Sequence, residues 1–168
     1  LNGTRCLGAV ENLRAELLPE FDMGVVTTPC VDMAVSGSQR GDKGQAGGHL
    51  LMVSVRLLAK KLVKIIWVET SIGALVTQGG KIVREALEHM RNAGYVCYKY
   101  IFRMCDYGDC SHRKRLCMIG IHSTVRDAWR LTAPEPTHGP HRPMCFEDIA
   151  EPDVTAAPED WVSSAVTY

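Results

Sequence analysis

The pattern of apolar and polar residues is clearest in residues 81–94, where apolar side chains recur three or four positions apart. This spacing predicts an α-helix with one apolar face and one charged face. Gly94 suits the left-handed turn that commonly ends a helix, so the helix is expected to stop there. The apolar face consists of Ile82, Val83, Ala86, Leu87 and Met90.

Two strands are predicted after this helix, separated by the polar turn 106–114. The first covers residues 95–105, in which every second side chain is apolar or aromatic, and the second covers 115–122. Beyond Ser123 the pattern fades, and the tail from Met144 carries six acidic residues without Lys or Arg, which predicts an irregular C-terminal extension. The alternating residues are Val96, Tyr98, Tyr100 and Phe102.

The first half of the chain predicts a strand, a helix and another strand. A short apolar strand covers 24–28 and stops at Pro29, because proline cannot continue the backbone hydrogen bonding. A glycine-rich, charged loop at 35–48 leads into a helix over 49–64, and a β-branched run at 64–69 forms the second strand.

Strands that alternate with helices predict an α/β fold with parallel crossovers. In such open sheets, ligands bind beyond the carboxyl ends of the strands. Cys30 and Glu69 each occupy such an end, so they face one crevice if their strands are neighbours. A weak helical pattern near 11–18 and a loop at 70–80 complete the prediction.

The composition describes one ordinary domain of 168 residues, of which 46% are hydrophobic and 23% charged. Nineteen Lys and Arg balance nineteen Asp and Glu, so no overall field draws the chain to nucleic acid or to a membrane. The most apolar stretch, 50–68, is interrupted by four cations and cannot cross a bilayer as one helix. Seven cysteines, without a CxxC pair or a secretory leader, favour a reducing cytoplasmic or nuclear compartment.

Three features carry candidate chemistry, and each also has a purely structural interpretation. Cys30, behind Pro29 at a strand end, is either a nucleophile or a small buried apolar residue. Glu69 is either a functional acid or a solvated one. Arg113 and Arg115 should point to one side, where they grip a phosphate or a carbonyl oxygen, unless they form only a solvated basic turn.

The order of the short motifs resembles the central block of the cytosine-5 DNA methyltransferases over residues 21–121. The pieces are TTPC, a glycine-bearing loop, WVET, an amphipathic helix followed by AGY, and DYGDCSHRKR. The family carries a Pro-Cys motif, an ENV motif ending a strand, a GY strand and a DYG-PQ-R-R segment in this order. The resemblance implies a partial Rossmann-like methyltransferase sheet with flanking helices.

The resemblance also implies a reaction on DNA with S-adenosylmethionine as cofactor. Cys30 would add to carbon 6 of a flipped cytosine, and carbon 5 of the resulting enamine would take the methyl group. Glu69 would hydrogen-bond ring nitrogen 3. Arg113 and Arg115 would contact the flipped nucleotide, with Arg115 on the carbonyl oxygen.

Further roles follow for the loop after Pro29 and for the residue after Glu69. Ser36, Arg40 and Lys43 would contact the DNA backbone. Pro29 and Thr70 would support the catalytic loop, although the family has asparagine where this chain has Thr70. Other departures from the family pattern are Val31, Ala34, Cys110 and Ser111.

The resemblance divides the chain into residues 1–122, the central part of a catalytic domain, and 123–168, a linker toward a target-recognition region. The glycine-rich turn with which the family holds S-adenosylmethionine does not occur in this sequence, which begins at Leu1 without an initiator Met. We therefore expect an interior piece of a larger methyltransferase, inactive alone because it cannot hold the cofactor unaided.

Three alternatives stay open. The departures favour a degenerate, non-catalytic module that binds DNA or a partner, and a tRNA cytosine-5 methyltransferase would share the same motifs. A C-x4-C-x-H-x4-C spacing would also suit a zinc knuckle, but the neighbouring cations argue against it, so no metal is expected. Its ligands would be Cys105, Cys110, His112 and Cys117.

Overall fold

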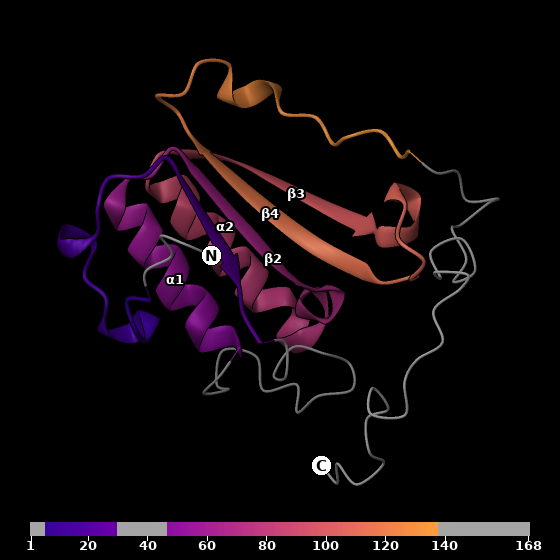
Figure 1. The fold of residues 1–168 in the computed structure, drawn as a ribbon, viewed down its shortest axis with the longest axis horizontal. Helices are drawn as coiled ribbons and strands as arrows, with labels where there is room; N and C mark the ends of the chain where they lie inside the picture. Colours follow the sequence, from indigo (N-terminus) through magenta and orange to yellow (C-terminus); the bar gives the residue numbers. More distant parts are fainter. Residues whose placement is uncertain (1–5, 30–46, 138–168) are drawn as a thin grey trace, which may run out of the picture.

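The structure, a computed structural model, describes residues 6–29 and 47–137 (Figure 1). Within these residues a four-stranded sheet is ordered β1-β2-β4-β3. The α/β class expected from the sequence is confirmed. The elements are β1 (Met23–Thr27), α1 (Gly47–Lys61), β2 (Ile65–Ser71), α2 (Lys81–Asn92), β3 (Tyr95–Arg103) and β4 (Lys114–His122).

The sheet is mixed, but the strands joined by helices, β1 with β2 and β2 with β3, run in the same direction, as the expected crossovers require. β1 and β2 pair in parallel, whereas β4 pairs antiparallel with both β2 and β3. The physical reason is the short connection between β3 and β4, which can join only antiparallel neighbours. The helix α2 therefore carries the chain past the position that β4 later fills, and β3 lies at the far edge of the sheet.

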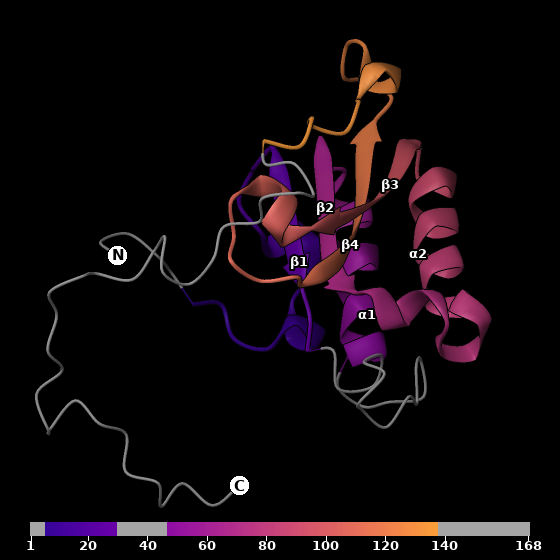
Figure 2. The same cartoon turned by 90° about the vertical axis from the view of Figure 1, so that its right-hand side faces the viewer.

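The two helices α1 and α2 cover one face of the sheet (Figure 2). The inward residues of the strands, such as Ile66, Val68, Leu116 and Met118, are fully buried against them. The predicted apolar face of α2 is confirmed, because all five of its residues are buried. Burial of this apolar surface is the main stabilising contribution to the fold.

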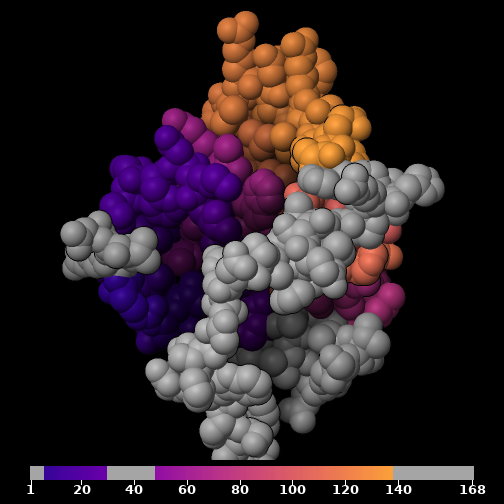
Figure 3. Space-filling view, turned by 45° about the vertical axis from the view of Figure 1, so that its right-hand side comes forward, coloured from indigo at the N-terminus to yellow at the C-terminus, as the bar shows by residue number. Residues whose placement is uncertain are grey.

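The second face of the sheet is covered in part by the segment 123–137, which packs on β3 and β4 and is drawn in orange at the top of Figure 3. Ala128 packs there against Ile119 and Ile121. Apart from a 3-10 turn at Ala128–Arg130, the segment is irregular, as its composition predicts. The rest of the predicted extension lies outside the described residues.

Two local expectations need correction. The weak helical pattern near 11–18 forms two 3-10 turns, Val10–Asn12 and Ala15–Leu17. Ala15 is the one buried residue in these two turns, so a longer helix here would gain no packing. The predicted loop 70–80 is more ordered than expected, since β2 extends to Ser71 and two further 3-10 turns follow, Ile72–Leu75 and Thr77–Gly80.

The helix predicted at 49–64 begins and ends slightly earlier than expected. It ends at Lys61, and Leu62 takes the left-handed conformation with φ 58°. The described helices include none with the length and apolarity required to cross a membrane.

The contact between β1 and α1 gives a first prediction. A Cβ added at Gly24 would meet the Leu58 side chain at 2.5 Å, so Gly24→Ala must displace packed atoms. We expect Gly24→Ala to lower the free energy of unfolding by about 1–3 kcal/mol in urea titrations followed by circular dichroism. The matched control is Val25→Thr on the exposed face of the same strand, expected to change it by less than about 1 kcal/mol. Equal effects would contradict close packing at Gly24.

Candidate active site

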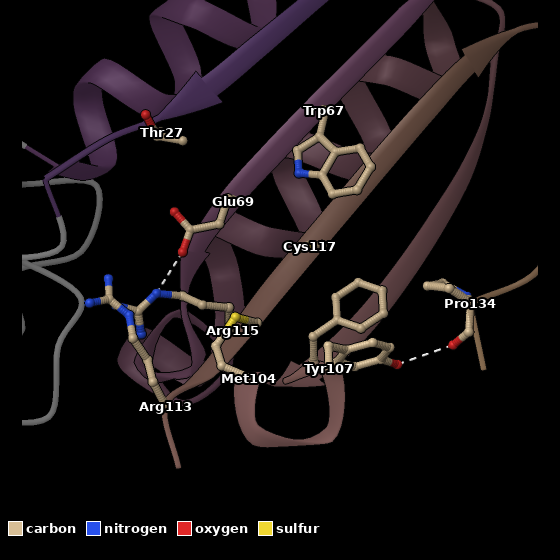
Figure 4. Close-up of a pocket in the computed structure, with 10 residues that line it drawn as sticks. Thr27, Trp67, Glu69, Met104, Tyr107, Arg113, Arg115, Cys117 and Pro134 are labelled. Atoms are coloured by element: carbon tan, nitrogen blue, oxygen red, sulfur yellow. Dashed lines mark hydrogen bonds and ion pairs between the residues drawn. The ribbon is translucent and has the colours of Figure 1, made fainter. Parts of the chain in front are cut away.

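A pocket of about 570 Å³ opens on the second face of the sheet, where β1 and β2 end and β4 begins (Figure 4). Residues from all four strands contribute to it, together with the turn after β3 and the segment 123–137. Most of the lining is apolar, and charged groups gather at one end. The lining residues are Thr27, Trp67, Glu69, Phe102, Met104, Tyr107, Arg113, Arg115, Cys117 and Pro134.

An ion pair forms the charged end of the pocket. Arg115 Nε lies 2.5 Å from Glu69 Oε1, with 16% and 29% of the two side chains exposed. Glu69 pairs across the sheet with Cys117, so Arg115 lies two residues away on β4 and meets the carboxylate diagonally. Each of the two side chains therefore neutralises the charge of the other at a place where water has only partial access to them.

Arg113 lies just before β4 and lines the same pocket, with its side chain directed toward the end that holds Glu69 (Figure 4). Its carbonyl accepts a hydrogen bond from the Met104 amide at 2.9 Å, which closes the turn between β3 and β4. Lys114 is exposed and is not part of the lining. The expectation that Arg113 and Arg115 share one side, away from Lys114, is thus confirmed.

The apolar part of the pocket is not predicted by the sequence pattern. Trp67 precedes Glu69 by two positions on β2 and shares its face, and Phe102 ends the alternating pattern of β3. That pattern signals one face of a strand but does not indicate that the face lines a pocket. Met104, Tyr107 and Pro134 come from the turn and the segment, where no periodicity marks them.

Cys117 lies beside the carboxylate in the floor of the pocket. Burial, and then the negative charge of Glu69, raise the pKa of the Cys117 thiol to about 11. The side chain is therefore a neutral thiol near pH 7. It is not suited to act as a nucleophile, which distinguishes it from the cysteine predicted to react.

The ends of β1 and β2 lie side by side, as the sequence predicts. The two strands are parallel neighbours, and Thr27 pairs with Glu69. Thr28 and the exposed Pro29 follow β1 and lead directly to Cys30 in the sequence. Cys30 itself, with Ser36, Arg40 and Lys43, lies outside the described residues, so the roles expected for these four stay predictions.

Thr70 lies on the opposite side of the sheet from Glu69, since alternate residues of a strand point to opposite faces. It is 2% exposed, within the core beneath the helices. The support of the catalytic loop expected from Thr70 and Pro29 stays a prediction, with Thr70 acting from the far side of β2.

The zinc alternative is not favoured by the geometry. Cys105 Sγ lies 3.5 Å from His112 Nδ1, but Cys110 is exposed on the turn and Cys117 belongs to the pocket floor. Among the residues that the structure describes, no three His, Cys, Asp or Glu side chains gather closely enough to hold a metal ion.

Comparisons with known proteins point to one family. The model of the family described as C-5 cytosine-specific DNA methylase matches residues 4–157. Type II methyltransferase M.Bsp6I of Bacillus sp. (strain RFL6) is 23% identical over 115 residues, which cover 68% of this chain and 36% of the relative. Type II methyltransferase M.BbvI of Brevibacillus brevis is 26% identical over 156 residues, covering 90% of this chain and 39% of the relative.

A solved structure shares the fold. A crystal structure assigned as a DNA modification methyltransferase, encoded within a prophage of Escherichia coli, aligns with a TM-score of 0.63 at 20% identity. The alignment covers 88% of this chain and 42% of that one. The chain therefore spans less than half the length of the proteins it matches.

The position of Cys117 gives a second prediction. At pH 8, iodoacetamide should label Cys117 far more slowly than the exposed Cys110, because burial and a raised pKa keep the Cys117 thiol protonated. Glu69→Gln should speed labelling of Cys117 about three- to tenfold, since loss of the negative charge lowers that pKa. Peptide mass spectrometry measures both rates.

The control for this experiment is Glu88→Gln, which removes the same charge from an exposed position on α2. It should leave the labelling of Cys117 unchanged. If Glu69→Gln and Glu88→Gln gave the same rate, the assigned contact between Glu69 and Cys117 would be wrong.

Proposed function

This chain belongs to the C-5 cytosine-specific DNA methylase family, and we propose that it carries the cytosine-binding half of a DNA cytosine-5 methyltransferase site. The observation that carries the proposal is the Glu69–Arg115 ion pair at the end of β2, beside the end of β1. Cys30 follows Thr27 by three residues, and three residues span at most about 11 Å. A tether of this length allows the thiol to meet the same pyrimidine ring as the carboxylate, as the proposal requires.

The proposed reaction begins with a flipped cytosine, because carbon 6 is inaccessible in a stacked duplex. The Cys30 thiolate adds to carbon 6; the electron pair of the 5,6 double bond forms a 4,5 double bond, which is the enamine, and the pair of the 3,4 double bond moves to ring nitrogen 3. The Glu69 carboxyl donates its proton to ring nitrogen 3, which neutralises the negative charge that develops there. Arg115, and Arg113 beside it, donate to the carbonyl oxygen.

The apolar lining of the pocket supports this assignment. A flat ring can pack against Trp67 and Phe102 while its polar edge meets Glu69 and Arg115. Hydrogen bonds in such a water-poor site are stronger than in bulk water, so they can stabilise a charge that appears only during addition.

The family implies S-adenosylmethionine as the methyl donor. The described residues do not provide a cradle for it: the pocket holds no glycine-rich turn, and residues 6–22 before β1 form only two 3-10 turns. We therefore derive no step through this cofactor. The chain's own contribution is addition to the base, and DNA contacts through Ser36, Arg40 and Lys43 are part of the same proposal.

The addition step can be tested without a methyl donor, because the enamine takes a proton from solvent at carbon 5. When the thiolate leaves, the original carbon-5 hydrogen is released to water as a proton. We expect the chain to catalyse release of tritium from carbon 5 of a cytosine placed in a mismatch, where extrusion costs little. Cys30→Ser should abolish release, and Glu69→Gln should lower its rate at least about tenfold.

The matched control is Cys110→Ser, the same substitution at an exposed cysteine outside the pocket, which should keep the full rate. Release that persists in Cys30→Ser would overturn the proposed nucleophile. No release by the unaltered chain would favour the non-catalytic alternative, and faster release from an RNA substrate of matched sequence would favour the tRNA-modifying branch.

A further inference from the structure

Three tyrosines fasten the segment 123–137 across the second face of the sheet. Tyr98 Oη donates a hydrogen bond to the carbonyl of Ala128 at 2.7 Å, and Tyr100 Oη to that of Leu131 at 3.0 Å. Tyr107 Oη donates to the carbonyl of Pro134 at 3.1 Å (Figure 4). The acceptors are three residues apart, so the segment is held at regular intervals. We call these three bonds the tyrosine ladder.

The rings of the tyrosine ladder also support one another. Tyr98 and Tyr100 stack with centroids 6.2 Å apart. Phe102 continues the row, 5.9 Å from Tyr100, and meets Tyr107 edge-on at 5.4 Å. Contacts of this kind restrict the orientation of each ring, so the tyrosine hydroxyl groups stay directed at the segment 123–137.

The two ends of the ladder differ in their surroundings. Ala128 and Leu131 also pack into the apolar cluster around Ile119 and Ile121, which holds that part of the segment without a hydrogen bond. Pro134 is not among the described members of that cluster and instead lines the pocket. Pro134 therefore depends more on its hydrogen bond from Tyr107 than Ala128 and Leu131 depend on theirs.

We propose that Tyr107 is a positioning residue whose hydrogen bond holds Pro134 as a wall of the pocket opposite the Glu69–Arg115 pair. Phe102 orients the Tyr107 ring, and the bond fixes the distance between the segment and the floor formed by Cys117. Without the bond the wall moves outward and the pocket admits small solutes more easily. That this wall contacts a cytosine rests on the proposed function, whereas its effect on the pocket does not.

The test uses Cys117 as a probe of access to the pocket. Labelling of the chain with methyl methanethiosulfonate, followed by trypsin digestion, reports on Cys117 alone through the peptide 116–126, which contains no other cysteine. Tyr107→Phe keeps the ring and removes the donor. It should raise the labelling rate of Cys117 about fivefold, as expected when one hydrogen bond no longer closes the pocket.

Tyr98→Phe is the matched control, because it removes the same kind of bond at the far end of the ladder. It should change the labelling of Cys117 by less than about twofold while speeding trypsin cleavage after Arg130 in the folded chain, since local opening controls such cleavage. Pro134→Ala, which reduces the wall without touching Tyr107, should raise the labelling of Cys117 as Tyr107→Phe does. Circular dichroism verifies that each variant is folded.

Labelling of Cys117 at the unaltered rate in folded Tyr107→Phe would overturn the proposal, as would equal labelling in Tyr98→Phe and Tyr107→Phe. A second measurement concerns the reaction. In the tritium-release assay, Tyr107→Phe should raise KM about fivefold and leave kcat near its original value, because a positioning residue acts on binding of the base. If the unaltered chain releases no tritium, the proposed function fails, and the labelling of Cys117 still decides the role of Tyr107.

Discussion

The antiparallel pairing of β2 with β4 is the constraint on which the site depends. Its register sets Glu69 opposite Cys117 and so brings Arg115, two residues away on the same face, to the carboxylate. A shift of one residue would turn Arg115 toward the helices and present Lys114 instead. Leu116 and Met118, fully buried against the helices, oppose such a shift, because it would expose them. The packing that stabilises the sheet therefore also selects which cation enters the pocket.

At the charged end of the pocket, Glu69 and Arg115 are poorly solvated, and each neutralises the charge of the other. A lone carboxylate on an apolar floor would carry a desolvation penalty, and Arg115 offsets it. In the proposed reaction Glu69 and ring nitrogen 3 share one proton, and the carbonyl oxygen of the ring accepts a hydrogen bond from Arg115. Both side chains therefore remain hydrogen-bonded when the pyrimidine binds. The desolvation penalty of binding the base is then smaller than the penalty for burying either charged side chain without a partner.

Local patterns predicted the elements well and their arrangement less well. The helix α2 and the face shared by Tyr98, Tyr100 and Phe102 follow from periodicity, which depends on neighbours in the sequence. The place of β4 between β2 and β3 does not, because strand order depends on contacts between distant segments. The adjacency of Glu69 to the end of β1 was predicted because parallel neighbours joined by one helix are common. The roles of Glu69, Arg113 and Arg115 came from the family resemblance rather than from the pattern.

Pro134 could not have been predicted as part of the site, because its contact with Tyr107 joins residues 27 positions apart. The ladder nevertheless has a simple geometric basis. Tyr98 and Tyr100 are two residues apart on a strand, a distance of about 7 Å. Three residues of extended chain would overshoot this spacing at about 9 Å. The 3-10 turn Ala128–Arg130 shortens the rise to about 2 Å per residue, or about 6 Å for three, so the carbonyls of Ala128 and Leu131 meet the two hydroxyls. Beyond Leu131 the turn has ended, and the longer step to Pro134 is matched by Tyr107, which lies past the end of β3. The turn in the segment is therefore what brings its extended end over the pocket.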